Sequence, residues 1–159
     1  MAIDSASLER RIVELGEVAD LAGQGRLPWL DFTRALVDVV PGSLGSLTVS
    51  HSDASRTFLA PVGYEPEVLQ SYSEHFAALN PWNDFWAKAA PGRVQISSHA
   101  APSLRYRKTE FYEDWLMRLD GRADGIGIKM PTTDGDVLPS FCICPTRDWR
   151  RPRQSIDTS

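Results

Sequence analysis

The sequence predicts one α+β domain with a mainly antiparallel sheet covered by helices. Two helical patterns open the chain, alternating strand patterns stand before and after its centre, and further helical patterns lie between them. The chain has 159 residues, of which 42% are hydrophobic. A chain of this length can bury a single core without help from a disulfide or a metal.

Two helices are expected first. Between Ser5 and Ala22, apolar residues recur with the period of an α-helix, and Gly23 is the expected C-terminal cap. The residues of this stripe are Leu8, Ile12, Leu15, Ala19 and Ala22. A second helix is expected to begin near Pro28 and to end at Pro41-Gly42, because proline favours the first turn and stops a helix later. Its stripe is Trp29, Phe32, Leu36 and Val40.

The pattern then changes to the alternation of β-strands. Leu47, Val49 and His51 alternate with polar residues, and a second run from Phe58 to Val62 follows a turn at 52–55. These runs predict a β-hairpin. Pro61 has no backbone N–H to donate, so the second strand is expected at an edge of the sheet.

Two helical segments rich in aromatic residues are expected next. The first runs from Pro66 to Leu79. Its predicted buried face is Leu69, Tyr72, Phe76 and Leu79. Asn80-Pro81 then combines an N-cap residue with a first-turn proline and predicts a short helix. Its stripe is Trp82, Phe85, Trp86 and Ala89.

A short strand from Arg93 to Ser97 and a polar connection over 98–108 come next. The connection holds a basic cluster of Arg105, Arg107 and Lys108, interpreted as a solvated surface. Thr109 is the expected cap of another helix, which ends at Asp120-Gly121. Its apolar residues are Phe111, Tyr112, Trp115, Leu116 and Leu119. Two strands, 126–130 and 141–143, complete the sheet across a turn at 132–136.

Composition excludes several classes of function. The net charge of −4 argues against a broad DNA-binding face. Cys142 and Cys144 lack further cysteines to pair with and are expected to be small buried side chains. His51, His75 and His99 fall on different elements, so neither a metal nor another cofactor is expected. No signal peptide and no membrane-spanning run is visible, which predicts a cytoplasmic location without membrane contact.

The aromatic residues are the most informative feature. Nine of them gather in two patches, 72–86 and 106–115, which is more than a core of this size requires. They form either a dense core or an apolar pocket, with Trp82 and Trp86 as the preferred pocket pair. A third reading is an enzyme that uses Tyr112, Asp114 or His99 as acid or base, but no paired groups of opposed environment support it.

The order Asn80-Pro81-Trp82, Pro91-Gly92-Arg93-Val94, Ser98-His99 and then the run from Thr109 to Leu116 resembles the N-terminal sensor domain of LuxR-type helix-turn-helix regulators. The likeness extends through about residue 152. It implies a PAS/GAF-like fold for residues 1–146, with 147–159 as a basic linker or frayed tail. The family's C-terminal DNA-binding domain does not fall within these 159 residues, so DNA contact is expected only through that separate domain.

The resemblance also implies a ligand site between the sheet and the helices. The expected ligand-binding residues are Tyr72, Phe76, Asn80, Trp82, Trp86, Phe111, Tyr112 and Trp115. Acyl-homoserine lactone receptors of the same superfamily place an acid where Asn80 stands here, so a lactone is not the expected ligand. The implied function is non-enzymatic sensing of a small apolar or aromatic molecule by a homodimer. The alternative is a dimerisation or interaction module whose aromatic residues are all core.

Overall fold

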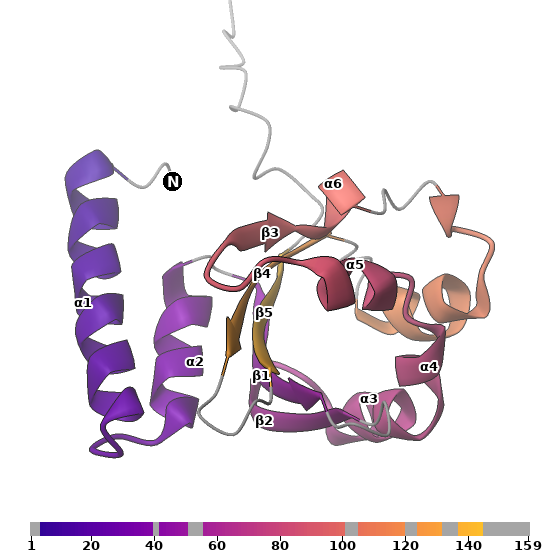
Figure 1. The fold of residues 1–159 in the computed structure, drawn as a ribbon, viewed down its shortest axis with the longest axis horizontal. Helices are drawn as coiled ribbons and strands as arrows, with labels where there is room; N and C mark the ends of the chain where they lie inside the picture. Colours follow the sequence, from indigo (N-terminus) through magenta and orange to yellow (C-terminus); the bar gives the residue numbers. More distant parts are fainter. Residues whose placement is uncertain are drawn as a thin grey trace, which may run out of the picture.

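The computed structural model describes residues 4–39, 42–50, 56–100, 105–119, 124–131 and 137–144. Five strands form one antiparallel sheet in the order β2-β1-β5-β4-β3. Figure 1 shows α1 and α2 on one side of the sheet, and the helical segments that follow β2 on the other. The predicted α+β class, with a mainly antiparallel sheet and helices on its faces, is therefore confirmed.

Helix α1 (Ser5–Gly23) is capped at both ends by side-chain or backbone hydrogen bonds. Asp4 accepts the N–H of Ser7 at 2.8 Å. Gly23 was expected as the C-terminal cap, but it remains inside the helix, and Gly25 adopts the left-handed conformation instead (φ +69°). The N–H of Arg26 then bonds to the carbonyl of Leu21, which is the Schellman arrangement.

The apolar stripe of α1 is only partly covered. Ala22 is buried and Leu15 is half-buried against α2 (Trp29–Val39), whereas Leu8 and Ile12 are exposed. Figure 1 places α2 between α1 and the sheet, so α1 forms an outer layer. The predicted stripe is therefore covered by α2 only in its C-terminal half.

Helix α2 approaches strand β1 (Leu44–Ser50) closely at Gly45. A Cβ atom on Gly45 would lie 2.6 Å from Cγ2 of Val37 and 3.0 Å from Cγ2 of Thr33. Glycine is needed here because any larger side chain would push the helix away from the sheet. Val40 and Pro41, the predicted end of this helix, lie outside the described residues.

Strand β1 pairs with β2 (Arg56–Val62) as the predicted hairpin. Strand β2 is at the edge of the sheet, as Pro61 indicated. A register shift occurs opposite Gly45 and Leu47, and nearby Ala60 has a positive φ of 51°. His51 and the turn at 52–55 lie outside the described residues.

The helical segment predicted over 66–79 contains a π-helical turn. Its parts are α3 (Pro66–Ser71), η1 (Tyr72–Phe76) and α4 (Ala77–Leu79). The wider turn shifts the positions that follow it around the axis. As a result Val68, Tyr72 and Phe76 are buried while Leu79 is 42% exposed. The prediction that Leu79 shares the buried face is wrong for this reason, and Leu69, which precedes the π-helical turn, is half-buried.

Helix α5 (Asn83–Lys88) begins three residues after Asn80 rather than directly at it. Its predicted stripe is nevertheless confirmed, since Trp82, Trp86 and Ala89 are buried. Strand β3 (Val94–Ile96) follows, and α6 (Ser97–Ala100) occupies the start of the segment predicted as a polar connection.

The second aromatic segment was predicted as an α-helix, but it is a π-helical turn, η3 (Phe111–Trp115), followed by a 3₁₀ turn, η4 (Leu116–Leu119). The hydroxyl of Thr109 accepts the N–H of Tyr112 at 3.4 Å, as a cap should. Strands β4 (Asp124–Pro131) and β5 (Val137–Cys144) complete the sheet. The remaining predictions fall outside the described residues: Asp120-Gly121, the turn at 132–136, the tail at 147–159, and the side chains of Cys142 and Cys144.

Candidate functional site

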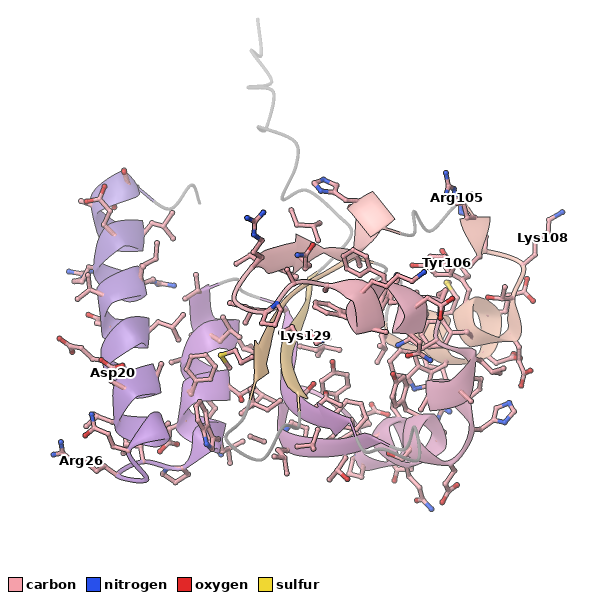
Figure 2. All side chains as sticks on the ribbon, in the orientation of Figure 1. Asp20, Arg26, Arg105, Tyr106, Lys108 and Lys129 are labelled. Atoms are coloured by element: carbon pink, nitrogen blue, oxygen red, sulfur yellow. The ribbon has the colours of Figure 1, made fainter. Side chains whose placement is uncertain are left out.

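The residues predicted to bind a ligand lie together between the sheet and the helices. Six of them belong to one buried cluster: Tyr72, Phe76, Trp82, Trp86, Phe111 and Trp115. Tyr112 packs against this cluster and is half-buried, and Asn80 is buried beside it. We call this set, with the rings that touch it, the aromatic cluster. Figure 2 shows side chains filling the space between this helical layer and the sheet.

Tyr72 stands where the sheet meets the helices. Its ring centroid is 5.2 Å from that of Phe58 on β2 and 4.8 Å from that of Trp115 on η3. Phe111 continues the series, with its ring 5.1 Å from Trp115 and 6.1 Å from Trp82. Edge-on and tilted pairs at these separations are attractive. The cluster therefore runs without interruption from the edge strand to α5.

A buried polar chain crosses the aromatic cluster. The amide nitrogen of Asn80 donates to the hydroxyl oxygen of Tyr72 at 2.8 Å, and the amide oxygen of Asn80 accepts the backbone N–H of Trp82 at 2.9 Å. One side chain thus fixes the tyrosine and the turn that leads into α5. Buried polar groups cost free energy unless they are bonded, which makes Asn80 the organising residue of this region.

Ser46 adds a second polar group on the floor formed by the sheet. Leu44 belongs to the same buried hydrophobic core as the aromatic cluster, and alternation along β1 places Ser46 on the same face as Leu44. The Ser46 side chain is 1% exposed, and its hydroxyl makes no hydrogen bond with the described residues. A buried hydroxyl without a partner is uncommon and calls for a reason.

Each π-helical turn begins and ends with a buried aromatic residue. Tyr72 and Phe76 are the first and last residues of η1, and Phe111 and Trp115 are the first and last residues of η3. On the outer surface, Nε2 of His75 lies 2.5 Å from a carboxylate oxygen of Glu110 and joins the two turns. Inside, the indole N–H of Trp115 donates to the carbonyl of Val68 at 3.1 Å.

Some site residues were missed by sequence reasoning. Tyr106 is 4% exposed and its ring contacts Trp82, Phe111 and Tyr112. It belonged to the second aromatic patch, so the composition of that patch was the available signal. Phe58 and Ser46 come from the hairpin, where alternation alone does not tell which face the helices will cover.

Of the residues considered for catalysis, Tyr112 is half-buried against the aromatic cluster. His99 on α6 and Asp114 on η3 are both exposed. Ser97 instead has a structural role, because its hydroxyl accepts the N–H of Gly125 at 2.8 Å. The basic residues Arg105, Arg107 and Lys108 are exposed, as predicted.

A separate groove of about 550 Å³ lies between α1 and α2, on the other face of the sheet. It is lined by Arg11, Glu14, Leu15, Val18, Ala35, Asp38 and Val39. The guanidinium of Arg11 donates to the backbone carbonyl of Asp38 at 2.8 Å. None of the predicted ligand-binding residues reaches this groove.

Within the described ranges, no three histidine, cysteine, aspartate or glutamate side chains gather as metal ligands. The helices in those ranges are also too short or too polar to cross a membrane. Comparison with protein-family models finds no match, and neither curated proteins nor solved structures match the chain.

Proposed function

We propose that this chain is the ligand-sensing domain of a LuxR-type transcriptional regulator, with a PAS/GAF-like fold, and that it binds a small, neutral, aromatic or apolar molecule at the aromatic cluster. Binding would favour one conformation of the domain, which a DNA-binding domain elsewhere in the regulator would read. The domain itself would be non-enzymatic, cytoplasmic and dimeric.

The observation that carries the proposal is the buried polar chain inside an aromatic surrounding. The Tyr72 hydroxyl accepts from Asn80, and among the residues that the structure describes no acceptor takes its own hydrogen, so this hydrogen can be donated to a ligand. A carbonyl or ether oxygen on a ligand would take that bond. Ser46 offers a second hydroxyl on the opposite wall. Apolar walls with a few convergent polar groups are the usual composition of a small-molecule site.

The fold and the π-helical turns give further support. The antiparallel sheet, with helices inserted between β2 and β3, is compatible with the mainly antiparallel, helix-flanked sheet that the resemblance implies. Single π-helical turns are frequently found at functional sites. Here two such turns hold four buried rings of the aromatic cluster.

A specific observation also favours the alternative, an interaction module without a ligand. Trp82 and Phe111 are each 1% exposed, as residues of a filled core would be. Under the proposal, a ligand must part these rings on entry. Under the alternative, they never separate.

A dye-binding experiment distinguishes the ligand-binding proposal from the alternative of a filled core. The dye is N-phenyl-1-naphthylamine, a neutral aromatic molecule that fluoresces in apolar surroundings. A panel of neutral aromatic compounds would be screened in parallel by thermal shift. We expect saturable dye binding and at least one compound that raises the melting temperature and displaces the dye. Tyr72→Phe should weaken that compound about fivefold or more, because it loses one hydrogen bond.

Leu47→Ala is the matched control. Leu47 is as buried as Trp82, but alternation places it on the α2 side of β1 with Gly45. This variant should lower stability and leave dye affinity unchanged. If no compound stabilises the wild type, and the dye binds Tyr72→Phe and Leu47→Ala equally, the aromatic residues are core and the proposal is wrong.

A further inference from the structure

Two buried serines at the start of the sheet differ in their hydrogen bonding. Ser43 and Ser46 are 4% and 1% exposed. The hydroxyl of Ser43 donates to the backbone carbonyl of Val37 on α2 at 3.3 Å. The hydroxyl of Ser46 makes no hydrogen bond with the described residues. The burial of Ser46 therefore needs an explanation that the burial of Ser43 does not.

Packing within the chain does not explain a serine at position 46. Burying a hydroxyl without a hydrogen bond costs free energy, and alanine, which is almost the same size, would be buried without that cost. A serine is favoured here only if its hydroxyl gains a partner under some condition. A bound molecule that reaches Ser46 would supply that partner.

Ser46 lies near Tyr72, on the face of the sheet that the aromatic cluster covers. Thr48 pairs with Phe58, which makes Ser46 a diagonal neighbour of Phe58 on the same face, about 7–8 Å away. The ring of Phe58 lies 5.2 Å from the ring of Tyr72. Figure 1 shows β2 beside the helical layer that begins with α3. The separation between the Ser46 and Tyr72 side chains is therefore on the scale of one substituted aromatic ring.

The edge strand is irregular opposite the same serine. The register of the β1–β2 pair shifts between Gly45 and Leu47, so that Ala60 and Pro61 together stand opposite Ser46. Ala60 has a φ of +51°, which is costly for a residue with a Cβ atom. Bulges and strained backbone both occur preferentially beside functional sites. Two unusual features, an unbonded hydroxyl and a strained bulge, thus meet at one position of the sheet.

The hydroxyls of Tyr72 and Ser46 differ in what they can recognise. The Tyr72 oxygen already accepts from Asn80, so this hydroxyl offers its hydrogen and calls for an acceptor such as a carbonyl oxygen. The Ser46 hydroxyl can both donate and accept, and another hydroxyl matches it best. The rings around them favour a flat aromatic body between the two polar groups.

We propose that Ser46 is a specificity-determining residue of the ligand site, and that the ligand belongs to the neutral hydroxyaryl carbonyl compounds. The carbonyl oxygen of such a compound accepts from Tyr72, and its hydroxyl bonds to Ser46. This inference rests on the proposed function, because it requires a ligand in the aromatic cluster. A site with a buried partner for a hydroxyl discriminates against analogues that lack the hydroxyl, since the partner then stays unbonded.

The first test measures thermal unfolding of the full chain without ligand. Ser43→Ala is the matched control, and it should lower the melting temperature by about 2–4 °C because the Val37 carbonyl loses its donor. Ser46→Ala should keep or raise the melting temperature, because it removes a hydroxyl that has no partner. An equal loss in both variants would show that the Ser46 hydroxyl is bonded in the free protein, and it would overturn the proposal.

The second test measures displacement of N-phenyl-1-naphthylamine by the three hydroxyacetophenone isomers and the three methylacetophenone isomers. Each pair shares the ring and the carbonyl group and differs by a hydroxyl in place of a methyl group of similar size. The buffer is acidic enough to keep the phenol neutral. For at least one pair, Ser46→Ala should reduce the preference for the hydroxyl compound about fivefold or more, whereas Ser43→Ala should leave it unchanged.

The outcomes separate this inference from the ligand site itself. If the dye is displaced but the wild type and Ser46→Ala show the same preference in every pair, Ser46 does not contact the ligand. The inference is then wrong, and the ligand site stands. A wild type that does not bind the dye overturns both.

Discussion

His75 and Glu110 join the two π-helical turns across the outside of the aromatic cluster, with the imidazole Nε2 2.5 Å from a carboxylate oxygen. Both side chains are about half exposed. They are 35 positions apart in sequence, so the pair closes a long loop around the cluster. It is the polar counterpart of the ring contacts made by Tyr72 and Trp115 beneath it.

A double-mutant cycle with His75→Ala and Glu110→Ala measures this link. We expect a coupling free energy of about 0.2–1 kcal/mol in urea unfolding, because exposed ion pairs are screened by solvent. The pair carries opposite charges only when the histidine is protonated. Additive single effects at low salt would show that the pair contributes nothing to stability.

Loss of Asn80 should cost more than loss of the Tyr72 hydroxyl. Asn80→Ala removes the partners of both the Tyr72 hydroxyl and the Trp82 N–H, and burying such groups unbonded costs about 1–3 kcal/mol each. Tyr72→Phe leaves one buried group without its partner, the Asn80 amide N–H, at about 1–3 kcal/mol. Urea unfolding followed by tryptophan fluorescence measures both. The reverse order of effects would contradict the role given to Asn80.

Gly45→Ala should destabilise the packing of α2 on the sheet. Its Cβ would lie 2.6 Å from Val37 Cγ2, and overpacking of this kind costs about 1–3 kcal/mol. Val37→Ala removes the clashing methyl group, so the double variant should recover part of the loss. Thermal unfolding of the four proteins gives the coupling. A Gly45→Ala protein as stable as the wild type would show that α2 moves aside freely.

Trp115→Phe should separate the hydrogen bond of this residue from its ring contacts. The change removes the indole N–H that donates to Val68 and leaves a ring to contact Tyr72 and Phe111. We expect a loss of several kcal/mol at most, about 1–3 of it from the unbonded carbonyl. Trp115→Ala should lose more, about 3–5 kcal/mol, because it also leaves a cavity. Equal losses would mean that the hydrogen bond accounts for the whole effect.

Local sequence patterns predicted most helices and strands, and for some of them also the position in the sheet or the buried face. Pro61 indicated an edge strand because a missing N–H cannot serve an interior ladder, and β2 is at the edge. The stripe of Trp82, Trp86 and Ala89 is buried as its spacing indicated. Most of the predicted ligand-binding residues lie in one buried cluster, because helices that cover the same sheet bury their apolar faces against it and against one another.

Other features depend on interactions that a periodic pattern does not encode. A π-helical turn has more residues per turn than an α-helix. A pattern read at 3.6 residues per turn therefore predicts a buried Leu79, whereas Leu79 is exposed. Gly23 and Gly25 are both suitable C-terminal cap residues. The helix continues through Gly23, which adds backbone hydrogen bonds, and Gly25 adopts the left-handed conformation. The burial of Ser46 was not predicted, because a serine that alternates with apolar residues in a strand normally faces solvent.

The position of α2 and the sheet between α1 and the aromatic cluster insulates these two regions from each other. Among the described elements, α1 makes its extensive contact with α2, whereas Tyr72 and Asn80 contact each other and the rings on the other face of the sheet. Free-energy effects at such distant positions usually add. The outermost helix can therefore acquire new surface residues, generation after generation, without any adjustment among the rings on the far side of the sheet.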